Sequence, residues 1–144
     1  MNPAKEYLSQ IKTLDSKIRR RQQEAKELRD AALSLGSTQM DPDRIRSASP
    51  DPDPMASQVT RYVDIQKEVQ AMIIELMELK HQIIGQIAEL DDSDCMRVLW
   101  KRYVDLKTFN QIADEIGYDI RTIFRIHGRA LQAFNEKYKF VKMT

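Results

Sequence analysis

The chain has 144 residues, with 23 Lys or Arg and 22 Asp or Glu side chains, and its formal net charge is +1. This length suits one small domain with an extended element, or two small helical units. Because no run of about eighteen apolar residues occurs, we expect no membrane-spanning helix and no membrane partner. Residues 1–6 carry charge and no apolar signal core, and the single cysteine, Cys95, fits a reducing compartment. We therefore expect a cytoplasmic protein.

Apolar residues recur at helical spacing, while glycine and proline are scarce, with 4 and 5 residues respectively. This pattern predicts an all-α fold. We expect a long antiparallel, coiled-coil-like helical hairpin, followed by a C-terminal helix-turn-helix domain. The first helix is expected to begin near Pro3, which suits a first helical turn, and to end at Gly36. Its heptad-like seam consists of Tyr7, Ile11, Leu14, Ile18, Arg21, Ala25, Leu28, Ala32 and Leu35.

A second long helix is expected to begin at Met55 or Ser57. One apolar stripe follows the rhythm of the first helix and consists of Tyr62, Ile65, Val69, Met72, Leu76, Leu79 and Ile83. A further stripe widens this apolar face and consists of Ile73, Met77, Ile84 and Ile87. Since one stripe can pack on the first helix, the surplus needs another partner. We expect residues 1–90 to form a hairpin that makes a homo-oligomer, with a dimer favoured.

An acidic segment rich in proline, residues 36–56, separates the two helices. It holds four of the five prolines, together with Asp41, Asp43, Asp51 and Asp53. Each proline removes an amide donor and disfavours helix at the preceding residue, so the segment is expected to be extended. Two interpretations remain open, a solvated linker or a contact segment for RNA polymerase or another basic partner.

Residues 91–144 are expected to form a separate domain, because the charge changes sign there. Residues 36–92 hold five basic and eleven acidic side chains, whereas residues 93–144 hold ten basic and six acidic ones. A net charge of +4 in this last part provides the phosphate attraction on which non-specific DNA binding rests. The helix that opens the domain is expected to be capped by Asp92 or Ser93, and its Trp100 and Tyr103 are interpreted as core.

A short helix, a glycine turn and a longer helix follow. Thr108 is the expected N-cap of the short helix, whose inward residues are Ile112, Ala113 and Ile116. Gly117 is expected to end that helix, since a tight turn needs a residue that tolerates positive φ. Asp119 is expected to cap the longer helix. This order is typical of a helix-turn-helix, whose second helix enters the DNA major groove.

Residues 103–113, YVDLKTFNQIA, and residues 117–131, GYDIRTIFRIHGRAL, resemble region four of sigma factors. The family pattern is R-Y-x-x-x-x-T-x-x-E-I-A, continued by G-x-S-x-x-T-V-x-R-x-x-x-R-A-L. This chain departs from it at Gln111, which replaces Glu, and at Asp119, which replaces Ser. The promoter-melting and core-binding regions of a sigma factor are absent, so the resemblance implies a DNA-binding domain and not a sigma factor.

The layout of the whole chain is similar to that of small regulators from phages and prophages of Gram-positive bacteria, the RinA and ArpU types of late transcription regulator. The residues that carry this shorter resemblance are residues 44–47, Met55 and residues 63–65. It implies a transcription regulator that works in the cytoplasm of a bacterial host.

The candidate DNA contacts lie on and around the second helix of the helix-turn-helix. Arg121 and Arg125 can each fork onto a guanine edge, which discriminates bases by roughly 1–3 kcal/mol, or they are simply solvated. Phe124 contacts a thymine methyl or sugar, or it packs on the long helices. We expect the DNA-binding residues to be Arg121, Thr122, Phe124, Arg125, Arg129, Thr108, Lys107 and Lys101.

Signals for an enzyme, a cofactor or a metal site are missing. The chain has no glycine-rich phosphate loop and no nucleophile elbow, and His81 and His127 have no partner at ligand spacing. The expected function is therefore sequence-specific regulation of transcription on double-stranded DNA. The alternatives are a DNA-packaging protein that resembles a small terminase subunit, and a protein-interaction module that captures a host factor.

Overall fold

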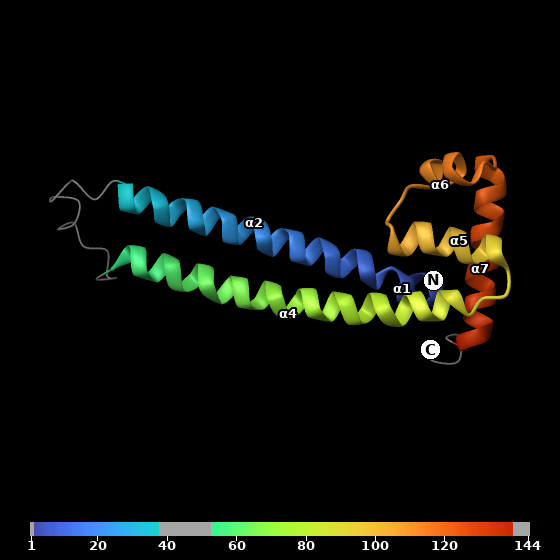
Figure 1. Ribbon diagram of the computed structural model, residues 1–144, viewed down its shortest axis with the longest axis horizontal. Helices are drawn as coiled ribbons and strands as arrows, with labels where there is room; N and C mark the ends of the chain where they lie inside the picture. Colours follow the sequence, from blue (N-terminus) through green and yellow to red (C-terminus); the bar gives the residue numbers. More distant parts are fainter. Residues whose placement is uncertain (1, 38–52, 140–144) are drawn as a thin grey trace. The chain divides into compact units, whose positions relative to one another are not determined.

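The computed structural model describes residues 2–37 and 53–139, and these residues form helices and no strand (Figure 1). The all-α expectation is therefore confirmed for the described residues. The helices are α1 (Pro3–Leu8), α2 (Gln10–Ser37), α4 (Pro54–Ala88), α5 (Ser93–Leu99), the π-helix η1 (Trp100–Val104), α6 (Phe109–Ile116) and α7 (Ile120–Tyr138).

Two compact units share these helices. One contains Met1–Asp15 together with Leu76–Thr144, and the other contains Ser16–Glu75. The N-terminal residues thus group with the C-terminal helices, a contact that no local pattern in the sequence indicates. The expected division at residue 90 differs from this grouping and stays a prediction.

The unit Ser16–Glu75 is a pair of helical segments, one from α2 and one from α4. On α2, Ile18, Ala25 and Ala32 are buried seven residues apart, as the heptad-like seam predicts. On α4, Ile65 and Val69 are buried. These short side chains leave a narrow core, so the pair depends on few apolar contacts.

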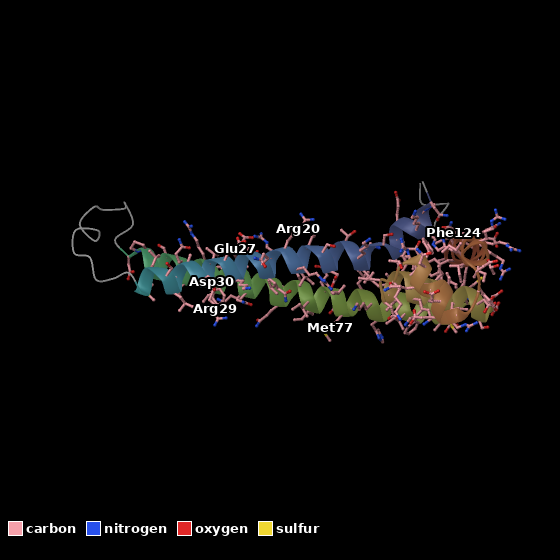
Figure 2. The ribbon with its side chains drawn as sticks, turned by 90° about the horizontal axis from the view of Figure 1, so that it is seen from above. Arg20, Glu27, Arg29, Asp30, Met77 and Phe124 are labelled. Carbon is pink, nitrogen blue, oxygen red and sulfur yellow. The ribbon has the colours of Figure 1, made fainter. Side chains whose placement is uncertain are left out.

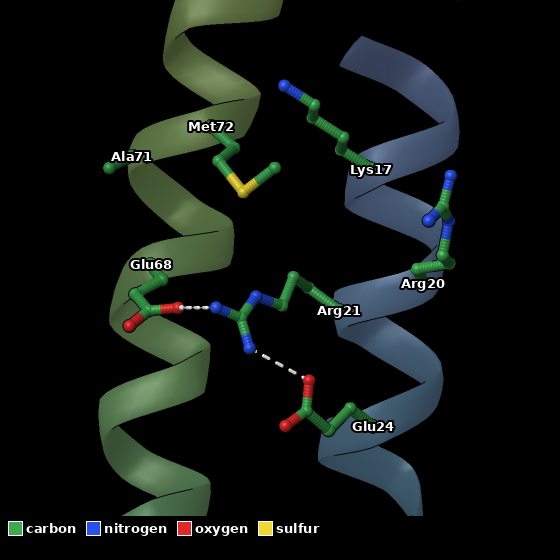
Figure 3. A pocket seen from close by; sticks show the side chains of 7 residues that line it. All are labelled: Lys17, Arg20, Arg21, Glu24, Glu68, Ala71 and Met72. Carbon is green, nitrogen blue, oxygen red and sulfur yellow. Dashed lines mark hydrogen bonds and ion pairs between the residues drawn. The ribbon is translucent and has the colours of Figure 1, made fainter. Parts of the chain in front are cut away.

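Arg21, which interrupts the apolar seam of α2, joins the two helices by an ion pair with Glu68 and also pairs with Glu24 of its own helix. Its guanidinium lies 2.8 Å from Glu24 and 3.2 Å from Glu68 of α4 (Figure 3). The three side chains are about half exposed, so solvent weakens the attraction. The ion pair between Arg21 and Glu68 favours one register of the two helices but contributes little to the free energy of unfolding.

The helix ends differ from the expected ones at two places. The first helix is interrupted at Ser9, whose N–H donates to Lys5 O as α1 ends. The role predicted for Gly36 as a helix stop is wrong, because α2 runs through Ser37. The α4 helix begins at Pro54, and residues 38–52 of the expected acidic linker, including Asp41, Asp43 and Asp51, lie outside the described residues.

The larger unit has a core built from α1, the end of α4, and α5 to α7. Its fully buried members include Leu8, Ile87, Leu99, Ile123 and Phe134. Polar groups at its edge are also satisfied across the chain. The hydroxyl of Tyr7 donates to Gln86 Oε1 at 2.5 Å, and that of Tyr138 donates to Gln86 O at 2.8 Å. These two hydrogen bonds connect α1 and α7 to Gln86 of α4.

Part of the second apolar stripe of α4 is uncovered. Met77 is 65% exposed and Ile73 36% exposed, and Figure 2 shows Met77 directed away from the ribbon. Ile87, from the same predicted stripe, is buried in the core. The surplus apolar face that the sequence predicts is therefore exposed at Ile73 and Met77 and buried at Ile87.

We expect Phe134→Ala to lower the free energy of unfolding by about 3–5 kcal/mol, because the substitution leaves a cavity where a fully buried ring stood. The Phe134 ring stacks with Tyr7 at a centroid distance of 6.0 Å and contacts Tyr138 in a tilted arrangement at 4.7 Å. Urea unfolding followed by circular dichroism measures the loss. Phe124→Ala is the matched control, with an expected loss below about 1 kcal/mol because that ring is 51% exposed. Equal losses would contradict the assigned core.

Candidate nucleic-acid interface

The start of α6 is fixed by a reciprocal pair of hydrogen bonds. The N–H of Gln111 donates to Thr108 Oγ1 at 3.2 Å, and the N–H of Thr108 donates to Gln111 Oε1 at 2.9 Å. This capping box satisfies two amide donors that the helix itself leaves free. The predicted cap at Thr108 is confirmed, and Gln111 fills the role that Glu has in the resembled pattern.

The turn between α6 and α7 depends on Gly117 and Asp119. Gly117 adopts φ 86°, a left-handed conformation, and its N–H donates to Ala113 O. The Asp119 carboxylate then accepts from the N–H of Thr122 at 2.7 Å and caps α7. That hydrogen bond, the largest cause, holds the pKa of Asp119 below its ordinary value. Both residues act as the sequence predicts.

The α7 helix has a buried face and an exposed face. Ile123, Ile126, Ala130, Leu131 and Phe134 are buried. Arg121, Arg125, Gly128 and Gln132, spaced by four, three and four residues, share the exposed face. Arg121 and Arg125 form no ion pair with any residue that the structure describes. Two guanidinium groups near the start of this helix are therefore available to an anionic partner.

The other predicted basic contacts are engaged within the protein. Lys107 forms an ion pair with Glu115, and Lys101 Nζ lies 3.8 Å from the same carboxylate. The two ammonium groups, Lys107 first, hold the pKa of Glu115 below its ordinary value. Arg129 lies 3.2 Å from Asp92, the N-cap of α5. A phosphate that approached these cations would have to compete with a carboxylate.

Phe124 is exposed on α7 but does not stand alone. Its ring contacts Phe109 of α6 edge to face, with centroids 5.1 Å apart, and Figure 2 shows it at the surface. The guanidinium carbon of Arg102 lies 4.2 Å from the centroid of Phe109. The expectation that Phe124 packs on the long helices is thus replaced by an aromatic contact within the α6–α7 pair. Thr122 is half-buried and bound to the Asp119 cap, as noted above.

Behind the exposed face, the buried Tyr103 and the half-buried His127 form a polar pair. Tyr103 Oη and His127 Nε2 are joined by a hydrogen bond of 2.7 Å. Burial raises the pKa of Tyr103 to about 12. Burial, and then the charges of Arg102 and Lys5, lower the pKa of His127 to about 4. The imidazole is therefore neutral near pH 7, and the pair links η1 to α7.

Cys95 is buried in α5, at 1% exposure, and belongs to the core of the larger unit. Burial, the largest cause, raises the pKa of its thiol. A raised pKa leaves little thiolate, so the position disfavours a reactive nucleophile. Trp100 and Tyr103 both pack in or against the core, as interpreted from the sequence.

Three basic residues that the sequence did not single out lie together beside Phe124. Lys5 of α1, Lys12 of α2 and Arg102 of η1 line one cavity of about 390 Å³ with Phe109 and Phe124. They come from separate elements, so no local spacing could have brought them together in a sequence pattern. Only the packing of α1 onto the C-terminal helices places them there.

Metal ligands and membrane-spanning segments are not found in the described ranges. Among residues 2–37 and 53–139, no cluster of three His, Cys, Asp or Glu side chains is arranged to hold a metal ion. Within the same ranges, no helix has the length and apolar character needed to cross a bilayer.

We expect Gly117→Ala and Gly128→Ala to change stability in opposite directions. Alanine at Gly117 is strained at φ 86° and should cost about 1 kcal/mol in the free energy of unfolding. Alanine at Gly128, inside α7 and facing open space, should add about 0.5–1 kcal/mol through helix propensity. Urea titrations of both variants measure the two effects, and the same sign for both would refute the assigned turn.

Stability should fall as the pH is lowered from about 6.5 to about 4, in part through His127. The unfolded chain binds more protons in this window, since the pKa of His127 is about 4 in the fold against an ordinary 6.5. The groups that face this ring are Tyr103, Arg102 and Lys5. Between about pH 7 and pH 5, the wild type should lose more unfolding free energy than His127→Gln, measured by urea titration. Equal losses would contradict a neutral imidazole.

Comparisons with known proteins identify no relative. No protein-family model matches the chain, and neither the curated protein sequences nor the solved structures contain a match. The function of the surface around α7 therefore has to be inferred from its geometry and its charges.

Proposed function

We propose that the chain is a sequence-specific, DNA-binding regulator of transcription, encoded by a phage or prophage, in which α6 and α7 act as a helix-turn-helix. In this proposal α7 lies in the major groove and α6 crosses the DNA backbone above it. The resemblance of residues 103–131 to sigma-factor region four motivates the assignment, and the capping of both helices is consistent with it.

The observation that carries the proposal is the contrast between paired and unpaired cations. Lys101, Lys107 and Arg129 are each held by a carboxylate. Arg121 and Arg125, one turn apart near the start of α7, have no such partner in the described part of the chain. An arginine at this end of a recognition helix can donate both N–H groups to O6 and N7 of guanine. Arg121 and Arg125 are therefore the proposed base readers.

The other predicted contacts take supporting roles in this proposal. Thr122 and Phe124 flank the two arginines, and Phe124 offers an apolar surface to a thymine methyl. Thr108, at the exposed start of α6, and the ion-paired cations Lys101, Lys107 and Arg129 lie around the edge, where phosphates run. Phosphate contacts position a protein on DNA but do not specify the sequence.

We place the contact between two copies on the exposed stripe of α4. The stripe contains Val59, Val63, Ile73, Ile74 and Met77, all at least 36% exposed. Lys67 and Glu78 lie on the same edge of this stripe by helical spacing. If two α4 helices pair antiparallel about their centres, Lys67 of each copy meets Glu78 of the other. This twofold complementarity favours a second copy over an unrelated helix.

A dimer of this kind would give each α7 its own half-site. Two half-sites one helical turn of DNA apart, or a multiple of that spacing, would follow from the symmetry. RNA polymerase is a proposed further partner, and the acidic residues between the long helices are its proposed contact.

Selection of bound duplexes from a random DNA library tests the proposal. The wild type should enrich a motif, whereas Arg121→Ala combined with Arg125→Ala should weaken binding to it by about 10- to 1,000-fold. The matched control is Arg29→Ala combined with Arg61→Ala. These two arginines are exposed on the long helices, and replacing them removes the same amount of charge. It should leave the motif and its affinity within about twofold of the wild type.

Two results would overturn this function. Failure of folded wild-type protein to enrich any motif would favour protein capture. A mass in solution of roughly eight or more copies, in place of two, would favour the ring of a DNA-packaging protein.

A further inference from the structure

The cavity beside α7 has the size of a small-molecule site. Its volume is about 390 Å³, which falls within the range of roughly 300–1,000 Å³ that ligand pockets occupy. Its lining comes from α1, the start of α2, η1, α6 and α7, all within one compact unit. No acidic side chain is among the lining residues.

Three cations surround the cavity without a carboxylate to balance them. Lys5, Lys12 and Arg102 form no ion pair with any residue in the described ranges, unlike Lys101 and Lys107. Arg102 is held in place, since its Nη1 donates to Lys107 O at 3.0 Å and its guanidinium lies over the ring of Phe109. A fixed guanidinium with two nearby ammonium groups is suited to an anion, because no reorganisation is required on binding.

Part of the cavity lining is aromatic. Phe109 lies edge to face with Phe124 at 5.1 Å and with His127 at 4.9 Å. The Phe124 ring is 51% exposed. Exposure of an aromatic ring to water is unfavourable, and a planar ligand that covered the ring would relieve this cost. The low pKa of His127 keeps its imidazole neutral near pH 7, so the ring is part of this lining and adds no charge.

The backbone around the cavity departs from regular helix in two places. Arg102 and Tyr103 lie on the π-helix η1, a form that occurs in short stretches and often at functional sites. Leu106, which also lines the cavity, has φ 58°. A left-handed leucine persists only where its surroundings hold it. Both departures turn Arg102 and Leu106 toward the same cavity.

We propose that this cavity binds a small organic anion with a planar aromatic body, of the aromatic carboxylate class. The carboxylate lies among Lys5, Lys12 and Arg102, and the ring lies against Phe124. Ligand binding at this site requires no DNA, so this proposal can be tested independently of the proposed function. Because Phe124 and His127 both belong to α7, a bound ligand would contact the helix that we assign to DNA recognition.

The test is a titration of the full chain with 2-naphthoate, without DNA, followed through the imidazole resonances in NMR spectra. The ring current of the ligand should shift His127 in a saturable way, while His81, exposed on α4, serves as the internal reference. 2-Naphthamide, an uncharged isostere of the probe, should bind about tenfold or more weakly than 2-naphthoate. Inorganic phosphate, an anion with no aromatic body, should bind at least about tenfold more weakly than naphthoate.

Variants separate the site from general charge effects. Lys5→Gln with Lys12→Gln should weaken naphthoate binding by about tenfold or more, whereas Lys26→Gln with Lys137→Gln removes the same charge and should change it by less than about twofold. Phe124→Ala should also weaken binding, and circular dichroism establishes that each variant is folded. Equal shifts at both histidines, equal binding of the amide, or unchanged binding in the Lys5/Lys12 variant would each overturn the proposal.

Discussion

The burial of the inner face of α7 is the constraint on which the larger unit depends. Ile123, Ile126, Ala130, Leu131 and Phe134 enter one core with α1, α5 and α6, and this fixes which side of α7 remains outside. A helix so buried presents Arg121 and Arg125 on its exposed face as a consequence of the 3.6-residue repeat. The hydrophobic effect on one face thus orients the charges on the other.

Ion pairs then determine which of the many cations of this region remain available to a partner. Carboxylates at Glu115 and Asp92 hold Lys101, Lys107 and Arg129 at the surface. Among the cations of this region without such a partner, Arg121 and Arg125 lie on α7, and Lys5, Lys12 and Arg102 lie around the cavity. A net charge of +1 for the whole chain conceals this division. The distribution of charge therefore says more about partners than its sum.

The two groups of unpaired cations offer different chemistry because their surroundings differ. Arg121 and Arg125 stand on an open helical face, which suits a large anionic surface such as a DNA groove. Lys5, Lys12 and Arg102 surround a hollow with aromatic walls, which suits a smaller anion. Phe124 lies between the two sites, so that one exposed ring belongs to both.

The sequence by itself determined the local features of this protein. The caps at Thr108 and Asp119, the turn at Gly117 and the helical periodicity were all readable, because each depends on residues within one or two helical turns. Only the tertiary structure decided which cations are paired, where α1 separates from α2, and that Lys5 and Lys12 lie beside Phe124. The ion pairs join residues 8 to 37 positions apart, and Lys5 and Lys12 lie more than a hundred positions from Phe124 in the chain, so no helical periodicity encodes these contacts.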